Sequence, residues 1–378
     1  MKIVIAPDSY KESLSALEVA TQIELGFREV FPDADYVKVP MADGGEGTVQ
    51  AMIEATQGRR VTVTVTGPLG EPVESFYALT GDGRTAMIEM AAASGLALVP
   101  PTLRNPNLTT SYGTGELITA ALNAGARHLI LGIGGSATND AGAGMLQALG
   151  VQLRDTQGAE LPRGGAALAQ LAHIDTSGLD ARLADCTIEV ACDVDNPLTG
   201  PRGASAIFGP QKGATPEMVK TLDAALHNFA HIVQREYGMD VDQVAGSGAA
   251  GGMGAAMLAF LHGQLRPGCE IIAKAVGLEA AVRDADLVIT GEGRIDQQTI
   301  FGKTPFGVAT VAKQFGKPVI GIAGSLGNNA HVVHGHGVDA IFSVLSRPCA
   351  IADAIAEAEF NVRSSARNIA AVMAIGRG

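Results

Sequence analysis

Five runs of mostly apolar residues, two near the start of the chain and three near its end, constrain the fold more than any other feature. They lie in "KIVIAPD", "YVKVPM", "DLVITGEG", "KPVIGIAG" and "DAIFSVL". Runs that are apolar on both faces are typical of parallel strands covered by helices on both sides. Because helical patterns separate the runs, the sequence predicts an α/β fold in which both chain ends build one doubly wound parallel sheet of the Rossmann or flavodoxin-like kind.

The segment between these runs follows a different pattern. From Arg59 the chain alternates at Val61, Val63 and Val65, and the turn signals "GPLGEP" and "GDGR" separate further strands. We therefore expect two α/β domains. A discontinuous doubly wound domain would comprise residues 1–60 and 284–378, and an inserted mixed domain of residues 61–283 would begin with antiparallel strands. A length of 378 residues agrees with two domains.

Two helix starts are marked by their capping residues. Ser15 and Glu18 have the spacing of a capping box, in which side chains satisfy the first backbone N–H groups. Thr215 as the N-cap and Pro216 in the first turn predict a helix that runs to Tyr237. These signals fix the helix starts more sharply than the apolar pattern alone.

The composition excludes several classes of partner. A formal net charge of -12 repels phosphate-rich surfaces, so we expect no nonspecific binding to nucleic acid or to anionic membranes. The apolar run "IVIA" near the N-terminus is too short for a signal peptide, and the four cysteines form no C-x-x-C pair. We expect a cytoplasmic monomer or homodimer that acts on small molecules.

The loops expected after the strands carry the candidate chemistry, because ligands bind at the carboxyl ends of the strands in open α/β sheets. Each loop joins glycines to carboxylates, hydroxyls or a cation: "APDSYKES", "MADGGEG", "GIGGSATND", "ACDVDNPLTGPRG" and "TGEGRID". Carboxylates suit Mg²⁺, backbone N–H groups suit phosphates, and Lys or Arg spreads charge in phosphoryl transfer. Hydride transfer needs fewer carboxylates, so the pattern favours a kinase over a dehydrogenase.

Three of the glycine- or histidine-rich segments have more than one interpretation. Gly132 to Ala137 fits the dinucleotide fingerprint G-x-G-x-x-A, with Asp155 as the ribose carboxylate, but it fits an anion-binding turn equally well. The segment "GSGAAGGMGAAM" predicts either close packing through small residues, which we favour, or a backbone cradle for phosphate. The histidines in "AHVVHGHG" have a spacing that a metal site could use, yet we favour a surface loop.

Taken together, six ordered motifs resemble the bacterial glycerate kinase family of glyoxylate, glucarate and galactarate catabolism, across essentially the whole chain. The motifs are "APDSYKESLSALEVA", "PMADGGEGT", "GIGGSATNDAGAGMLQALG", "DVDNPLTGPRGASAIFGPQKGA", "GSGAAGGMG" and "TGEGRIDQQTIFGKTP". The resemblance implies a two-domain α/β fold, ATP as co-substrate with Mg²⁺, and phosphorylation of D-glycerate at the 2-hydroxyl. Phosphorylation at the 3-hydroxyl is the alternative, and an NAD-dependent hydroxy-acid dehydrogenase is a distant one.

The resemblance and the loop positions together predict a role for each polar residue of these loops. Asp193 is our candidate for the base that orients or deprotonates the attacking hydroxyl, because it ends a buried strand in the densest acidic loop. Lys11 and Arg294 would assist catalysis by neutralising phosphate oxygens or the substrate carboxylate. We expect substrate contacts from Asp8, Ser136, Asn139, Asp140 and Asn196, phosphate or ATP contacts from Gly134, Gly135, Gly251, Gly252, Lys212 and Lys303, and metal ligation by Asp43, Glu46, Glu292 and Asp296.

Overall fold

The computed structural model describes residues 1–45 and 47–376, and the chain divides into two compact units. Unit 1 comprises Met1–Asp43, Gln50–Gln57 and the chain from Pro267 onward, and unit 2 comprises Gly44–Val49 and Gly58–Arg266. The sequence predicts the second boundary between the domains at residue 284. The structure groups α9 (Gly268–Ala275) and α10 (Leu278–Val282) with unit 1, because both pack on α11 (Thr304–Gln314) of that unit.

The sheet of unit 1 confirms the predicted five parallel strands. Its strand order is β15-β13-β11-β1-β2, and all of its pairings are parallel. The strands are β1 (Lys2–Pro7), β2 (Asp35–Lys38), β11 (Leu287–Gly291), β13 (Val319–Ala323) and β15 (Ala340–Ser343). Both chain ends therefore contribute to one doubly wound sheet, as the apolar runs predict.

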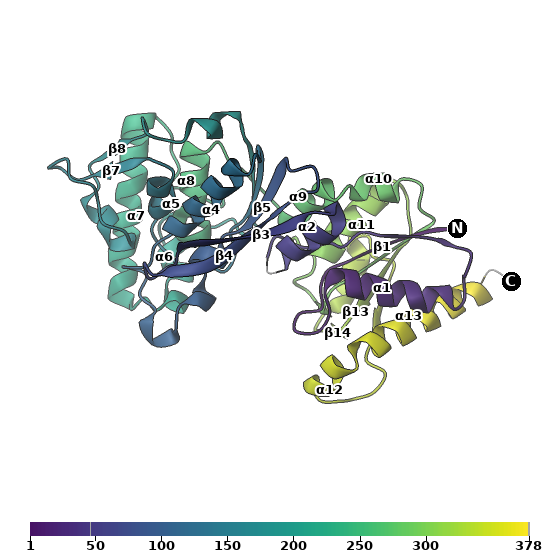
Figure 1. Ribbon diagram of the computed structural model, residues 1–378. Coiled ribbons are helices and arrows are strands. Elements are labelled where there is room, and N and C mark those ends of the chain that lie inside the picture. The colour runs from purple at the N-terminus through teal and green to yellow at the C-terminus, as the bar shows by residue number, and fades with distance from the viewer. Residues whose placement is uncertain (46, 377–378) are drawn as a thin grey trace. The chain divides into compact units, whose positions relative to one another are not determined.

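Helices cover both sides of this sheet, which explains why its central strands β1, β11 and β13 are apolar on both faces (Figure 1). The helices α1 (Ala16–Arg28) and α13 (Ala358–Ile375) pack against each other, and their buried side chains share a core with Ile3, Ile5 and Ile289. The helix α11 contacts the same strands from the other side. The remaining elements of unit 1 are β12 (Arg294–Ile295), β14 (Ser325–Leu326), η6 (Ala330–His336) and α12 (Ile351–Ala356), and α2 (Thr48–Thr56) spans the division.

Unit 2 has a mixed sheet with the strand order β10-β9-β6-β5-β4-β3. Its antiparallel part is β3 (Arg59–Thr66), β4 (Pro72–Leu79) and β5 (Thr85–Glu89), as the period-two pattern predicts, and its parallel part continues through β6 (His128–Gly132), β9 (Thr187–Ala191) and β10 (Gln264–Arg266). A separate pair is formed by β7 (Gln152–Arg154) and β8 (His173–Asp175).

The helices of unit 2 vary widely in length. The α-helices are α3 (Ala91–Ser94), α4 (Tyr112–Asn123), α5 (Ala143–Ala148), α6 (Ala204–Phe208), α7 (Pro216–Tyr237) and α8 (Ala249–Phe260). The 3₁₀ turns are η1 (Leu96–Leu98), η2 (Pro101–Leu103), η3 (Gly165–Gln170), η4 (Ala181–Asp185) and η5 (Pro210–Lys212). The predicted caps are confirmed: Thr215 caps α7, and Ser15 with Glu18 forms the capping box of α1 in unit 1.

Within the described part of the chain, none of the helices combines the length and the apolar character that a membrane crossing requires.

Parallel pairing brings the predicted functional loops together within each unit. In unit 1, Pro7 pairs with Gly291, so the loops that begin at Asp8 and Glu292 leave the sheet side by side. In unit 2, Gly132 pairs with Ala191, so the glycine-rich loop lies beside the acidic loop that contains Asp193.

The contact between α1 and α13 generates a stability prediction, because it depends on the missing side chain of Gly26. A Cβ atom at this position would lie 2.4 Å from the Arg363 carbonyl oxygen and 2.8 Å from the Arg367 nitrogen, both backbone atoms of α13. We expect Gly26→Ala to lower the free energy of unfolding by about 1–3 kcal/mol through overpacking, although alanine favours helix. Urea unfolding measures this effect.

Gly335 provides the control, because a Cβ atom there would meet nothing within 4 Å and its backbone needs no positive φ. Gly335→Ala should leave stability within about 0.5 kcal/mol of the wild type, as for most surface substitutions. A Gly26→Ala variant as stable as the wild type would contradict the packing described here.

Candidate functional site

Two carboxylates at the ends of neighbouring strands, Asp8 after β1 and Glu292 after β11, form the centre of the polar cluster in unit 1. One Asp8 oxygen accepts a hydrogen bond from the Ser9 backbone N–H at 2.7 Å, and the other accepts from the Thr304 hydroxyl at 2.6 Å. Glu292 accepts from the Thr299 hydroxyl at 2.7 Å and from the Lys303 ammonium at 3.2 Å. Both side chains are thus held in fixed orientations.

Burial raises the pKa values of both carboxyl groups. It raises the pKa of Asp8 to about 7, and the neighbouring carboxylates of Asp43 and Glu292 add to the effect. The pKa of Glu292 is also raised by burial, although Thr299 and Lys303 oppose the rise. Carboxylates that repel each other in a poorly hydrated place attract either a proton or a cation.

Cationic and dipolar groups surround this carboxylate pair. Lys303 occupies the N-cap position of α11 without a side-chain capping bond, and the hydroxyl of Thr304, the first residue of that helix, donates to Asp8. The positive end of the helix dipole therefore faces the same region, which favours bound anions. Lys11 is exposed, and the largely exposed side chain of Arg294 forms an ion pair with Asp296 at 3.3 Å.

The expected metal ligands are only partly brought together. Asp43 is close enough to Asp8 and Glu292 to influence both of their pKa values, whereas Asp296 pairs with Arg294. Glu46 lies outside the described residues. No three His, Cys, Asp or Glu side chains of the described chain are placed to hold a metal ion by themselves. One or two carboxylates suffice for Mg²⁺ when phosphates and water complete its coordination.

The loop that follows β6 in unit 2 combines exposed glycines with a buried lysine. Gly134 and Gly135 are exposed, and Gly135 has a φ of +74°, a conformation that favours glycine. Lys212 is 2% exposed, and its ammonium group donates to the Ser136 hydroxyl and to the Thr138 carbonyl, both at 2.6 Å. Lys212 therefore fixes this loop through hydrogen bonds on its buried side. Its burial lowers its pKa from 10.5 to about 7, although nearby Asp140 opposes the fall.

Polar groups next to Lys212 fix the rest of the loop. The Asn139 amide donates to the Ser205 hydroxyl at 2.9 Å. Fully buried Asp140 accepts from the backbone N–H and the hydroxyl of Ser111, at 2.9 and 2.8 Å. Thr138 Oγ1 and Asn139 Oδ1 are buried and have no hydrogen-bond partner among the described residues. Unsatisfied buried oxygens are costly, so this loop leaves capacity for a donor from water or a ligand.

The acidic loop after β9 presents Asp193 to solvent. One guanidinium nitrogen of Arg202 donates to both carboxylate oxygens of Asp195, at 2.9 and 3.0 Å, and the Asn196 amide donates to the Arg202 carbonyl at 2.7 Å. Asp195 and Asn196 therefore both tie the start of this loop to Arg202. The pairing of β6 with β9 places Asp193 in the loop next to Gly134 and Gly135.

Gly251 and Gly252 lie at a backbone contact. A Cβ atom at Gly251 would lie 2.0 Å from the Thr138 carbonyl oxygen, and one at Gly252 would lie 2.9 Å from Ala141 Cα. The two glycine-rich motifs thus pack against each other, as the favoured interpretation predicts. The left-handed backbone of Ala141 and Ala250, with φ of +51° and +53°, lies at this same contact. Such strain persists only where surrounding packing imposes it.

The dinucleotide interpretation of Gly132 to Ala137 does not fit the structure. Asp155 accepts hydrogen bonds from the backbone N–H groups of Gln157 and Ala159, so it stabilises a turn next to β7. The next α-helix, α5, begins only at Ala143, so the glycine turn does not open a helix. In the histidine-rich turn η6, His334 bonds the Val338 carbonyl, which agrees with the expected loop.

Four hydroxyl residues of the two polar clusters were missed by sequence analysis: Ser111, Ser205, Thr299 and Thr304. Three of them hold an expected residue from a distant point in the chain. Only Thr304 carried a usable signal, because it begins a helix directly after a glycine and a lysine in "GKTP".

Comparisons with known proteins agree with this combination of fold and residues. The family model described as "Glycerate kinase family" matches residues 3–374. Glycerate kinase of Haemophilus influenzae is 61% identical over 99% of both chains. Glycerate 2-kinase of Escherichia coli is 60% identical over 100% of this chain and 99% of its own. The crystal structure of a putative glycerate kinase 2 from Salmonella typhimurium LT2 is 64% identical, with a TM-score of 0.93 over 100% of this chain and 99% of that chain. The chain belongs to the glycerate kinase family.

Proposed function

We propose that the protein transfers the γ-phosphoryl group of ATP to the 2-hydroxyl of D-glycerate, giving 2-phospho-D-glycerate. The observation that carries the proposal is the pair of half-buried Asp8 and buried Glu292 beside Lys303, in a chain similar over its whole length to a glycerate 2-kinase. Transfer to the 3-hydroxyl is the alternative. A cytoplasmic location and a monomeric or homodimeric state remain predictions of the sequence.

The polar cluster of unit 1 is suited to the phosphates of ATP. Lys303 and the N-terminus of α11 offer positive charge there. The more exposed Lys11 and Arg294 can neutralise the negative charge that develops on the phosphoryl group during transfer. The raised pKa values of Asp8 and Glu292 mean that a cation would relieve their repulsion. Glu292 and Asp43 are the residues that would hold Mg²⁺. The metal would neutralise charge on the transferred phosphoryl oxygens.

The loop pair of unit 2 is suited to glycerate. The exposed backbone of Gly134 and Gly135, with the Ser136 hydroxyl that Lys212 orients, can donate hydrogen bonds to the glycerate carboxylate. Asp193, in the adjacent loop, would accept the proton of the attacking hydroxyl or orient it. Buried Asn139 and Asp140 would support this loop, and Asn196 would brace the neighbouring one.

Phosphorus NMR of the reaction mixture tests this function. The protein, ATP, Mg²⁺ and D-glycerate should give a new phosphomonoester signal split by a single carbon-bound proton, because the phosphate of the 2-isomer is attached to a CH group. A signal split by two protons would identify the 3-isomer and contradict the proposed position. No new phosphomonoester with D-glycerate would contradict the kinase assignment itself.

The role of Asp193 is tested by removing its charge. Asp193→Asn keeps the size of the side chain and a hydrogen-bonding oxygen, so we expect kcat to fall by roughly 10²–10⁴ with little change in KM. Asp195→Asn is the matched control. It breaks an exposed ion pair with Arg202 and should change kcat by less than about threefold. Near-normal kcat in Asp193→Asn would show that another group takes the proton.

The raised pKa of Asp8 should make the stability of the folded protein depend on pH. Its pKa is about 7 in the folded state and 3.8 in the unfolded reference, so the folded protein binds more protons between these values. Stability is therefore lost as pH rises from about 4 to 7, and Asp8→Asn removes that loss. Without divalent cations, the Tm of Asp8→Asn should exceed that of the wild type by at least about 2 °C at pH 8, a difference that shrinks at pH 4.5.

Activity provides the second part of this test. Asp8→Asn should lose activity at pH 8 while gaining stability, as expected of a charge that is kept for function at a cost in stability. A Tm difference that does not change between pH 4.5 and pH 8 would contradict the raised pKa of Asp8.

A further inference from the structure

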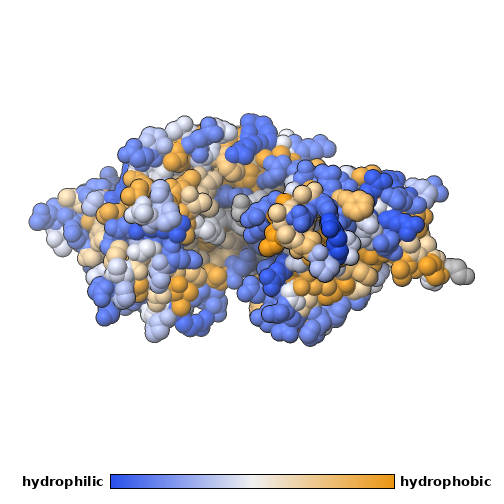
Figure 2. Space-filling model, turned by 90° about the horizontal axis from the view of Figure 1, so that it is seen from below, coloured by the Kyte–Doolittle hydropathy of each residue, from blue (hydrophilic) through white to orange (hydrophobic). Residues whose placement is uncertain are grey.

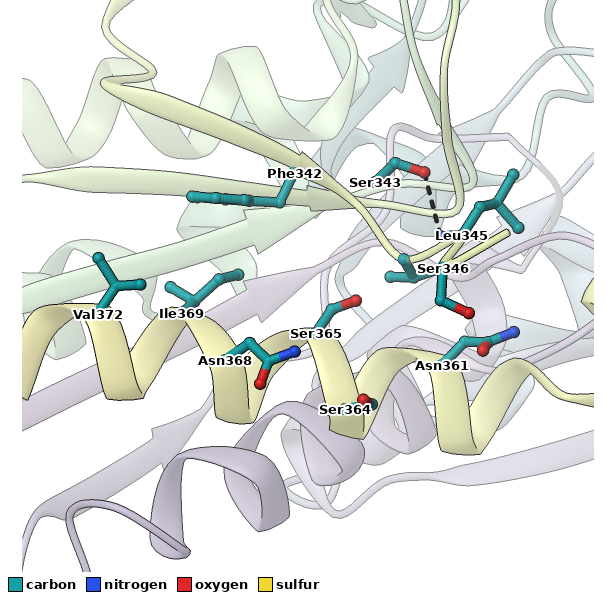
Figure 3. Close-up of a pocket in the computed structure, with 11 residues that line it drawn as sticks. Phe342, Ser343, Leu345, Ser346, Asn361, Ser364, Ser365, Asn368, Ile369 and Val372 are labelled. Carbon is teal, nitrogen blue, oxygen red and sulfur yellow. Dashed lines mark hydrogen bonds between the residues drawn. The ribbon is translucent and has the colours of Figure 1, made fainter. Parts of the chain in front are cut away.

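Unit 1 contains a pocket of about 290 Å³ between the end of β15 and one face of α13, away from the residues discussed above (Figure 3). We call it the β15–α13 pocket. Its volume lies near the lower limit of known ligand sites, which is about 300 Å³. The space therefore fits a compact ring system with a few substituents.

The two ends of the pocket differ in character. At one end the Phe342 ring lies across from Ile369 and Val372, which project from α13 (Figure 3). At the other end, beyond the carboxyl end of β15, Ser346 lies near Asn361. An aromatic ring opposite aliphatic side chains favours a flat apolar group, whereas the polar end favours hydroxyl groups.

The Asn361 side chain is the strongest sign that the pocket binds something. It is 5% exposed, and its amide makes no hydrogen bond with any residue that the structure describes. The hydroxyls of Ser364 and Ser365, which also line the pocket, likewise have no described partner. The Asn361 amide atoms are not among the described buried polar atoms that lack a partner, so the small exposed part of this residue includes its polar end, which opens into the pocket. A ligand with both donors and acceptors would satisfy it.

None of the described residues that line the pocket carries a charge. The part of the ligand held there is therefore neutral, planar and rich in donors and acceptors. We propose that the β15–α13 pocket binds the base and ribose of an adenine nucleotide. The base would lie between Phe342 and the α13 side chains Ile369 and Val372, and the ribose hydroxyls would face Asn361 and Ser346. Aromatic rings stack on any base, and an amide side chain can both donate to and accept from ribose hydroxyls.

The register of the sheet relates this pocket to the phosphate site proposed above. Phe342 lies level with Gly291, so Ser343 lies level with Glu292 and Asp8. Only β13 separates β15 from β11, a distance of about 10 Å across the sheet. A nucleoside in the pocket would direct its phosphates along this edge, over the end of β13. That the nucleotide is the co-substrate ATP rests on the proposed function, whereas adenosine binding does not.

Calorimetric titration with adenosine, which lacks phosphate, tests the pocket directly. Val372→Trp would fill the apolar end from a position that is 70% exposed, and Asn361→Leu removes the amide at constant size. Ile375→Trp is the matched control, because this residue is 81% exposed on the same helix and does not line the pocket. Figure 2 shows hydrophobic side chains gathered beside this C-terminal end, so a further aromatic ring there is tolerable. Circular dichroism and Tm verify that each variant folds.

We expect both pocket variants to weaken adenosine binding at least about tenfold, and the control to leave it unchanged. A parallel rise in KM for ATP with kcat retained would identify the nucleoside as that of the co-substrate. An unchanged KM for ATP would show that the pocket binds a nucleoside other than that of the co-substrate ATP. Adenosine binding that survives both substitutions, or no adenosine binding by the wild type, would overturn the proposal. A wild type that binds adenosine in this way yet fails to phosphorylate glycerate would refute only the proposed function.

Discussion

Ionisable side chains buried directly behind the ends of parallel strands are the constraint on which both units depend. A charge removed from water costs several kcal/mol unless hydrogen bonds or an opposite charge compensate it. In unit 2 the Lys212 ammonium is compensated by the Ser136 hydroxyl and the Thr138 carbonyl, so the loop after β6 has one arrangement. In unit 1 the Glu292 carboxylate is compensated by Thr299 and Lys303. The loops that carry the candidate chemistry are therefore fixed by their own buried groups.

This arrangement limits stability in favour of function. The pKa values of Asp8 and Glu292 are raised because their charged forms are poorly hydrated. The left-handed backbone at Ala141 and Ala250 adds strain of order 1–3 kcal/mol for each residue. The contact of Gly251 with the Thr138 carbonyl fixes that backbone, and a larger residue could not be accommodated. The poor hydration of the carboxylates and the backbone strain both occur beside loops whose residues match the motifs of a phosphotransferase.

Short-range patterns made much of the fold predictable from sequence. The five strands of unit 1, the capping box of Ser15 and Glu18, and the Thr215 cap each depend on residues within a few positions of one another. The burial of Lys212 was not predictable, because a lysine next to a glycine is equally typical of an exposed loop. The bond from Thr304 to Asp8 joins positions 296 residues apart and is decided by the pairing of β1 with β11. The candidate loops could therefore be named, but not the contacts that hold them.

The pKa of Lys212 is the most direct test of the claim that a buried charge organises the glycine-rich loop. Selective ¹³C labelling of lysine side chains, with Lys212→Met to assign the signal, gives this value by NMR titration. The burial of Lys212 predicts a pKa of about 7 in place of 10.5, although nearby Asp140 opposes the fall. A Lys212 signal that titrates near 10.5 would mean that the ammonium group is hydrated and does not hold the loop.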